Sequence, residues 1–101
     1  MIKRILVNLI QNGVQAMPKG GTLTLSATNQ KHLLKIDIED TGEGIPKEVQ
    51  SKLFTPLITT KSKGQGFGLP VVKRMTEAMN GTVTFKSEIG KGTKFTLQFS
   101  I

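Results

Sequence analysis

The sequence lacks several residue types that particular kinds of chemistry require. It contains no cysteine, tyrosine or tryptophan, and a single histidine, among 101 residues. The absence of cysteine excludes disulfide bonds and thiolate metal sites, and it is compatible with a cytoplasmic location. No apolar run approaches the roughly 20 residues of a membrane-spanning helix. Asn8, Gln11 and Asn12 interrupt the early apolar stretch, so no signal peptide is indicated, and membrane attachment of a parent protein is left open.

The chain is strongly basic, with a formal net charge of +7. Such a balance fits nucleic acid, an acidic protein or a phosphate-bearing ligand as a partner. However, the lysines form no dense run, no tyrosine or tryptophan can stack on bases, and no zinc-finger or RNA-binding sheet motif is present. We therefore expect no nucleic-acid partner. The 37% hydrophobic and 21% charged residues are typical of one globular domain over residues 1–101.

Two long amphipathic helices and one short helix are expected from apolar spacing. Residues 2–17 and 68–79 carry apolar side chains every three or four positions. Asn80-Gly81 is a typical stop signal for the second of these helices. A short helix is predicted over Pro46–Leu53, because proline is well suited to the first helical turn. Together these helices predict one layer of the fold.

Alternating residues predict two β-hairpins. The first joins apolar positions at 23–27 and 34–38 across the polar turn NQKH, and the second joins TVTFKSE and KFTLQFSI across IGKGT. In the last strand, one face is apolar, comprising Phe95, Leu97, Phe99 and Ile101. Two hairpins with two long helices predict a two-layer α/β sandwich. Its sheet would be mixed but largely antiparallel, with helices covering one face.

Two asparagines on the first predicted helix could hold a cation. Asn8 and Asn12 are four residues apart and therefore lie on the same side. A neutral amide oxygen is a suitable ligand for Mg²⁺ that also binds substrate phosphates. The alternative is that both are ordinary solvent-facing helix residues. Taken alone, this pair leaves the two interpretations open.

The segment DTGEGIP follows a predicted strand and contains Asp40, Gly42 and Gly44. One interpretation is a simple turn in which Asp40 accepts a local backbone hydrogen bond. The other is a binding loop, in which the carboxylate accepts from the exocyclic amine of a ligand. The glycines would then let the backbone pass close to a planar ring. As an isolated motif, the segment does not decide between them.

A second glycine-rich segment lies within the long connection FTPLITTKSKGQGFG and leads into the second long helix. Gly64, Gly66 and Gly68 could direct backbone N–H groups toward phosphate oxygens at the helix start. Lys61, just upstream, could pair with phosphate charge. The alternative is a flexible hinge. Connections of this length are often lids, and we expect residues 56–66 to be mobile.

The order of these motifs resembles that of the ATP-binding catalytic domain of sensor histidine kinases. The corresponding boxes are NLIQNGVQAM, DTGEGIP, LFTPLITTK, GQGFGLPVVKRM and GKGTKFTLQF, and they cover nearly the whole chain. These domains belong to the Bergerat class of ATP-binding folds. The short lid and its TTK sequence resemble the kinases related to nitrogen regulation. The extra residues with which the family domain usually begins are missing or shortened here, and the chain is expected to be a fragment.

The resemblance implies roles for individual residues. Asn12 would coordinate a Mg²⁺ ion that bridges the ATP phosphates, and Asn8 would assist on the phosphate side. Asp40 would accept a hydrogen bond from the adenine amino group. Gly42 and Gly44 would shape the adenine pocket.

The remaining implied contacts concern the phosphates and the back of the adenine pocket. Gly64, Gly66 and Gly68 would cradle the phosphates, with Leu69 packing beneath them. Thr93 would support the adenine region, and Lys61 would be the lid cation on the terminal phosphate. Lys61 is therefore the one candidate catalytic residue.

Two departures of this sequence from related patterns bear on mechanism. Asn8 occupies the position at which hydrolytic relatives carry a glutamate that activates water, so transfer to a partner is favoured over hydrolysis. The only histidine, His32, lies in a predicted turn that does not resemble a phosphoacceptor site. The resemblance therefore implies that the acceptor histidine lies on a separate dimerisation domain of the same parent protein. That domain would pass the phosphoryl group to a response regulator.

Two other functions are open. One is a serine-directed anti-sigma kinase of the same fold, and the other is a nucleotide-sensing or docking module without turnover. The dimerising helices also lie outside this sequence, so residues 1–101 are expected to be monomeric.

Overall fold

The computed structural model describes residues 2–54 and 69–100. Its elements are α1 (Ile2–Gln15), β1 (Leu23–Gln30), β2 (Leu33–Asp40), α2 (Lys47–Gln50), α3 (Leu69–Ala78), β3 (Gly81–Glu88) and β4 (Gly92–Ser100). Among the described residues, no helix is long and apolar enough to cross a lipid bilayer.

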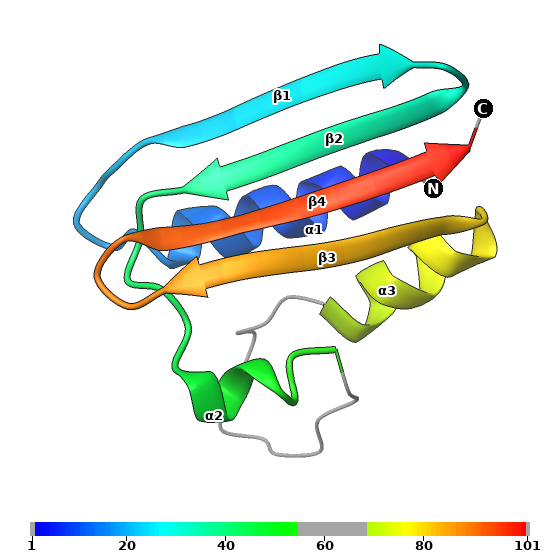
Figure 1. The fold of residues 1–101 in the computed structure, drawn as a ribbon. Coiled ribbons are helices and arrows are strands. Elements are labelled where there is room, and N and C mark those ends of the chain that lie inside the picture. The colour runs from blue at the N-terminus through cyan, green and yellow to red at the C-terminus, as the bar shows by residue number, and fades with distance from the viewer. Residues whose placement is uncertain (1, 55–68, 101) are drawn as a thin grey trace.

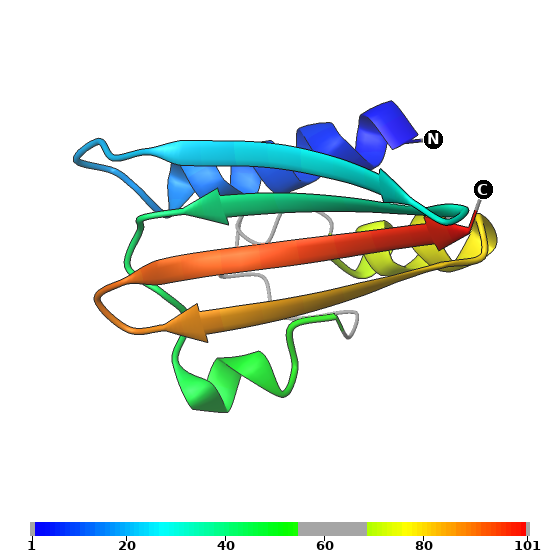
Figure 2. The ribbon, with the colours of Figure 1, turned by 45° about the horizontal axis from the view of Figure 1, so that its top comes forward.

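The four strands form one sheet in the order β1-β2-β4-β3, and each pairing is antiparallel. Helices α1 and α3 lie together against one face, while the other face is not covered by a helix of the described chain (Figures 1 and 2). The predicted two-layer sandwich with helices on one face is confirmed. The described strands include no parallel pair, so the mixed character expected of the sheet is not seen among them.

The first hairpin is tighter than predicted. Strand β1 continues through Asn29 and Gln30, which pair with Leu34 and Leu33, so the four-residue turn predicted for NQKH is wrong. The turn comprises only Lys31 and His32, which both have positive φ angles. Two left-handed residues match the twist of the flanking strands, whereas polar composition alone suggests a longer loop.

The core lies between the sheet and the two long helices. Strand β4 alternates, and it buries Phe95, Leu97 and Phe99 against the helices. The other buried apolar side chains come from α1, β2 and α3: Ile5, Leu9, Ile36, Ile38, Leu69 and Val72. The predicted apolar face of the last strand is confirmed for its three described members.

The helices end close to where the sequence predicted. Helix α1 ends at Gln15 rather than residue 17, and α3 covers Leu69–Ala78 of the predicted 68–79. Asn80 ends the α3 region with φ 61°, a left-handed conformation that asparagine tolerates.

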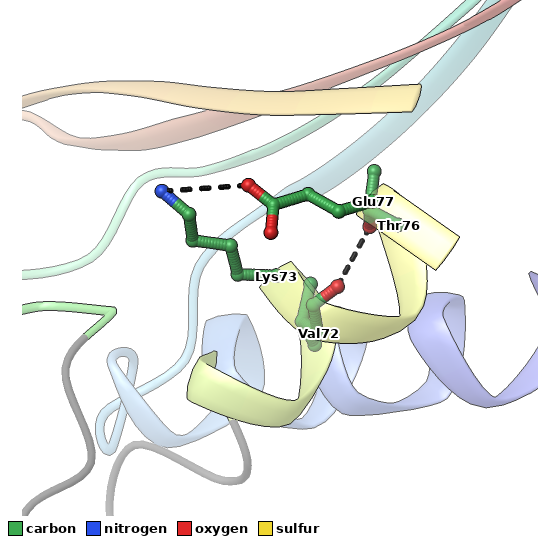
Figure 3. Close-up of polar contacts among 4 residues, drawn as sticks. All are labelled: Val72, Lys73, Thr76 and Glu77. Atoms are coloured by element: carbon green, nitrogen blue, oxygen red, sulfur yellow. Dashed lines mark hydrogen bonds and ion pairs between the residues drawn. The ribbon is translucent and has the colours of Figure 1, made fainter. Parts of the chain in front are cut away.

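Helix α3 carries one buried polar group. The buried hydroxyl of Thr76 donates to the carbonyl oxygen of Val72 at 2.7 Å, which satisfies it within the helix (Figure 3). On the solvent side, the Lys73 ammonium lies 3.8 Å from the Glu77 carboxylate. One side of α3 therefore faces the core, where the hydroxyl of Thr76 is hydrogen-bonded within the helix, and the other side is charged.

The short helix α2 lies beyond β3, at the opposite edge of the sheet from β1 (Figure 2). It covers only Lys47–Gln50 of the predicted Pro46–Leu53, and the chain continues in turns to Phe54. The Phe54 and Phe85 rings pack edge to face with their centroids 5.8 Å apart. The Lys73 ammonium lies 5.6 Å from the centroid of the Phe54 ring. This aromatic contact anchors the α2 region to the sheet.

Candidate functional site

Asp40 lies at the end of β2, and its side chain is almost completely buried, with 6% of the residue exposed. Its Oδ1 atom accepts a hydrogen bond from the Gly42 backbone N–H at 2.8 Å. Burial raises the pKa of Asp40 above its ordinary value; the backbone N–H groups of Gly42 and Thr93 oppose this, and nearby Glu39 adds a smaller increase. A buried carboxyl group is thus held in place by backbone donors and retains further acceptor capacity.

The loop that follows Asp40 is tied to three other parts of the chain. Thr41 donates its N–H to the Thr22 carbonyl at 3.2 Å, before β1. The Glu43 N–H donates to the Ala16 carbonyl at the end of α1, also at 3.2 Å. The Glu43 carbonyl accepts from Gly90 N–H in the β3–β4 turn at 2.9 Å. These bonds fix the loop around the Asp40 carboxyl group.

The two glycines of this loop are required by close packing. A Cβ atom at Gly42 would collide with the carbonyl group of Ala16, and one at Gly44 would collide with that of Glu88. Gly44 also has φ 82°, a conformation that side-chain-bearing residues rarely adopt. The sequence suggested glycine as a source of freedom near a ligand. In the structure, glycine allows the loop to lie directly on α1 and β3.

Ser87 connects this loop to the last hairpin. Its hydroxyl oxygen accepts from the Ile45 N–H at 2.8 Å and lies 2.8 Å from the hydroxyl of Thr93. Thr93 itself is 5% exposed. Thr93 lies opposite Asp40 in the pairing of β2 with β4. Ser87 was not predicted, because a single serine in a strand has no distinguishing pattern.

Helix α1 passes Asp40 at Gly13. A Cβ atom built at Gly13 would lie 2.7 Å from Leu23 Cδ1 and 3.6 Å from Asp40 Oδ2. The missing side chain therefore lets the helix approach the carboxyl group closely. Sequence reasoning missed this residue, although an interior helical glycine costs about 1 kcal/mol and often indicates close backbone packing.

Asn8 and Asn12 lie on one side of α1, and both are half-buried. Asn12 directly precedes Gly13, which places it at the Asp40 end of the helix. Within residues 2–54 and 69–100, no side-chain hydrogen bond involves either amide group. The same residues contain no cluster of three or more histidine or acidic side chains that could hold a metal. A cation here would therefore take amide and ligand oxygens, a donor set that suits Mg²⁺.

The remaining predicted site residues cannot all be placed. Leu69 is buried at the start of α3 with 2% exposed and belongs to the core. Lys61, Gly64, Gly66 and Gly68, together with the segment 56–66 predicted to be mobile, lie outside the described residues.

The sheet, its single helical layer and the loop after a buried carboxyl group define a Bergerat-type α/β sandwich. The chain belongs to the family described as "Histidine kinase-, DNA gyrase B-, and HSP90-like ATPase", which matches residues 1–101. Membership in this family of ATPases, and the resemblance to histidine kinase catalytic domains on which the sequence interpretation rested, are thereby confirmed.

Individual proteins agree with this assignment. Sporulation kinase A of Bacillus subtilis is 39% identical over 97% of this chain, and sensor histidine kinase ZraS of Escherichia coli is 38% identical over 95%. The chain spans only 16% and 21% of these two relatives. The catalytic domain of histidine kinase ThkA superposes with a TM-score of 0.84 at 27% identity, covering 98% of this chain and 65% of that one. The expected likeness to nitrogen-regulation kinases stays a prediction.

Proposed function

We propose that this domain binds Mg²⁺-ATP and presents the γ-phosphoryl group to a histidine on a separate dimerisation domain. The observation that carries the proposal is the buried Asp40 carboxyl group, held by backbone N–H groups at the end of β2. The relatives of this chain in sequence are named sensor and sporulation kinases, which supports a kinase function. In this proposal, residues 1–101 supply nucleotide binding and phosphoryl donation.

Asp40 gives the site its preference for adenine. The Gly42 N–H donates to one oxygen atom of the Asp40 carboxylate, and the carboxylate has further lone pairs that can accept from a ligand donor. The amino group of adenine is such a donor. Guanine carries a carbonyl oxygen at the same ring position, and two acceptors facing each other in a buried site would be unfavourable. Ser87 and Thr93 contribute by holding the loop and the strand around this contact.

The phosphate end of the site is assigned to α1. Asn12 would hold the magnesium ion through its amide oxygen, and Asn8, one turn earlier, would face the phosphates. The ion would supply charge neutralisation for the triphosphate. Because a neutral amide cannot take a proton from water, Asn8 cannot act as the general base for hydrolysis. This favours transfer to a histidine nucleophile, for which positioning and charge neutralisation are the main requirements.

The acceptor histidine is assigned to another part of the parent protein. The only histidine of the chain, His32, is exposed in the turn between β1 and β2. A response regulator would receive the phosphoryl group afterwards. One structural neighbour is a histidine kinase ThkA solved in complex with response regulator protein TrrA, which supports a similar partnership here. We place this activity in the cytoplasm.

Nucleotide binding can be tested by titrating Mg²⁺-ATP in a calorimeter. Asp40→Asn should weaken binding by about 10- to 100-fold, the typical effect of changing a hydrogen bond to a charged group. Asn12→Ala should weaken binding in Mg²⁺ and have less effect in EDTA. Asn29→Ala, on exposed β1, is the matched control and should bind as wild type does. Unchanged binding in both site variants would refute the assignment.

Transfer can be tested separately with labelled ATP and a dimerisation domain from a sensor histidine kinase. Label on that domain that is stable in base and lost in acid is expected of phosphohistidine. Tight ATP binding without any labelled partner would instead favour a docking module without turnover. Base-labile label on a serine would favour the anti-sigma type of kinase.

A further inference from the structure

Three polar side chains form one row across the sheet. Asp40 on β2 lies opposite Thr93 on β4, and Thr93 lies opposite Ser87 on β3. Residues directly opposite each other in antiparallel strands share a face of the sheet. Two residues further along the same strands, the paired Ile38 and Phe95 belong to the core. The polar row therefore lies at the end of the core, on the face of the sheet that the helices cover.

The Ser87 hydroxyl group has three polar neighbours. Its oxygen lies 2.8 Å from the Ile45 nitrogen, 2.8 Å from Thr93 Oγ1 and 3.3 Å from the Gly92 carbonyl oxygen. A backbone N–H can only donate, a carbonyl can only accept, and a hydroxyl has one hydrogen and two lone pairs. All three contacts can be hydrogen bonds only when Ser87 donates to Gly92 and accepts from both Ile45 and Thr93.

The reverse direction would leave a buried hydrogen without a partner. If Ser87 donated to Thr93, the Thr93 hydroxyl hydrogen would have no acceptor among residues 2–54 and 69–100. Thr93 is only 5% exposed, and an unpaired donor at a buried position is costly. Thr93 therefore donates to Ser87, and this bond fixes the orientation of the Thr93 hydroxyl group.

The fixed hydroxyl group provides a second acceptor beside Asp40. Its hydrogen is directed at Ser87, and within the described parts of the chain no group donates to the Thr93 oxygen. Asp40 accepts from the Gly42 N–H at one oxygen atom and also has lone pairs left. Because the Cβ atoms of directly opposite residues are about 4.5–5.5 Å apart, one ligand group can reach both side chains. An exocyclic amine, which carries two hydrogens, suits this pair of acceptors.

We propose that Ser87 is a positioning residue of the adenine site, which holds the Thr93 hydroxyl group so that it offers only lone pairs to the nucleotide. Asp40 and Thr93 then accept the two hydrogens of the adenine amino group. A carbonyl oxygen at the same ring position would face two acceptors and no donor. This inference rests on the proposed nucleotide function and deepens it, because it assigns the choice of purine to Ser87 as well as to Asp40.

The test compares the binding of ATP with that of inosine triphosphate, in which a carbonyl group replaces the amino group. Calorimetry in Mg²⁺ gives the ratio of the two dissociation constants for each protein. In Ser87→Ala, the Thr93 hydroxyl group can rotate and donate to the carbonyl oxygen. The preference for ATP should therefore fall by about three- to tenfold, the effect of one hydrogen bond. If Ser87 only supported the loop, both nucleotides would weaken equally, and an unchanged ratio would overturn the proposal.

Three further variants show whether the effect passes through Thr93. Ser87→Thr keeps a hydroxyl group at this position and should keep the preference for ATP. Ser26→Ala makes the matched change at an exposed serine of β1 and should leave the ratio unchanged. In a protein that already carries Thr93→Val, Ser87→Ala should not change the ratio further, because the group through which Ser87 acts is gone. A further change in that background contradicts the proposal.

The hydrogen bond can also be tested by NMR without nucleotide and without substitution. In mixed H₂O and D₂O, a slowly exchanging hydroxyl hydrogen splits the threonine Cβ signal through its isotope shift. The Thr93 hydroxyl should exchange at least about tenfold more slowly than that of exposed Thr24. Equal exchange at the two threonines would overturn the proposal, even where Ser87→Ala does not fold.

The binding data separate this inference from the proposed function. A wild-type chain that binds neither nucleotide would refute the nucleotide function itself, and the inference with it. ATP binding that is weakened by Asp40→Asn, with a preference for ATP that is unaffected by Ser87→Ala, would refute the role of Ser87 alone.

Discussion

The loop after Asp40 and the side of α1 that carries Asn8 and Asn12 belong to the same candidate site but are built differently. The loop is buried at its start and bonded to α1, to the segment before β1 and to the β3–β4 turn. The asparagine amides are half-buried and have no hydrogen-bonded partner among the described residues. The proposed adenine end is therefore organised by the fold itself, whereas the proposed phosphate end would be completed by ligand and metal. Changes in the loop should reduce stability, whereas changes at the asparagines should mainly affect binding.

The largest effect on stability is expected at Gly44. Gly44 and Gly90 have nearly the same φ angle, 82° and 84°, but only Gly44 has a backbone carbonyl in the way of a Cβ atom. Gly90→Ala should cost about 1–2 kcal/mol from conformation alone. Gly44→Ala adds a clash worth about 1–3 kcal/mol. Urea unfolding of both variants measures the difference, and equal losses would show that packing does not fix the loop.

The second prediction concerns Asp40 and pH. Because burial raises the pKa of Asp40 in the folded state, this group contributes stability at pH values below its unfolded pKa. That contribution is lost as the pH rises through the folded pKa. Asp40→Asn keeps the shape and has no carboxyl group to ionise. The melting temperature of Asp40→Asn relative to wild type should therefore rise between pH 4 and pH 7.

This pH effect has a clear control. Asp37 is half-buried on the same strand, and its carboxylate accepts from Thr96 at 2.6 Å. Asp37→Asn makes the same substitution at this less buried carboxylate, and its melting temperature should not rise relative to wild type over the same pH interval. A fall for Asp40→Asn would mean that the backbone donors outweigh burial at this site.

The smallest effect is expected at the asparagines. Asn8→Ala and Asn12→Ala each remove, from a helix interior, an amide that has no hydrogen-bonded partner within residues 2–54 and 69–100. Each should therefore raise stability by about 0.5 kcal/mol through helix propensity. The measurement is urea unfolding without nucleotide. Exposed Gln11→Ala, on another side of α1, is the control, with a smaller gain. A loss above 1 kcal/mol at either asparagine would show that the fold also depends on this end of the site.

Much of the architecture could be predicted from local pattern. Alternation over β2 placed Asp40 at a strand end, and the apolar spacing of both long helices predicted the layer that covers the sheet. The hairpin turn was mispredicted, because Asn29 and Gln30 are polar residues of an exposed edge strand and resemble a loop in composition. Short polar strands depend on pairing with a distant neighbour, which local sequence does not contain.

The sequence could predict that residues of the candidate site lie close together, but it could not predict the packing contacts that hold them there. The motif order placed Asp40 and Thr93 in one site, and the structure brings these two residues together. The reason for Gly42 could not be predicted, because its close neighbour Ala16 lies on a separate element. Ser87 and Gly13 were missed for a related reason. Their importance comes from single long-range contacts and produces no periodic pattern.

The bond between Glu43 and Ala16 has a consequence for how such a domain can vary among relatives. It joins the last turn of α1 to the loop that carries the glycines, and Gly42 packs on the same carbonyl group. Lengthening or shortening α1 by one residue would rotate that carbonyl away and deprive the loop of its support. Insertions should therefore accumulate in the α1–β1 connection, beyond Met17, while the end of α1 and the glycine loop are inherited together.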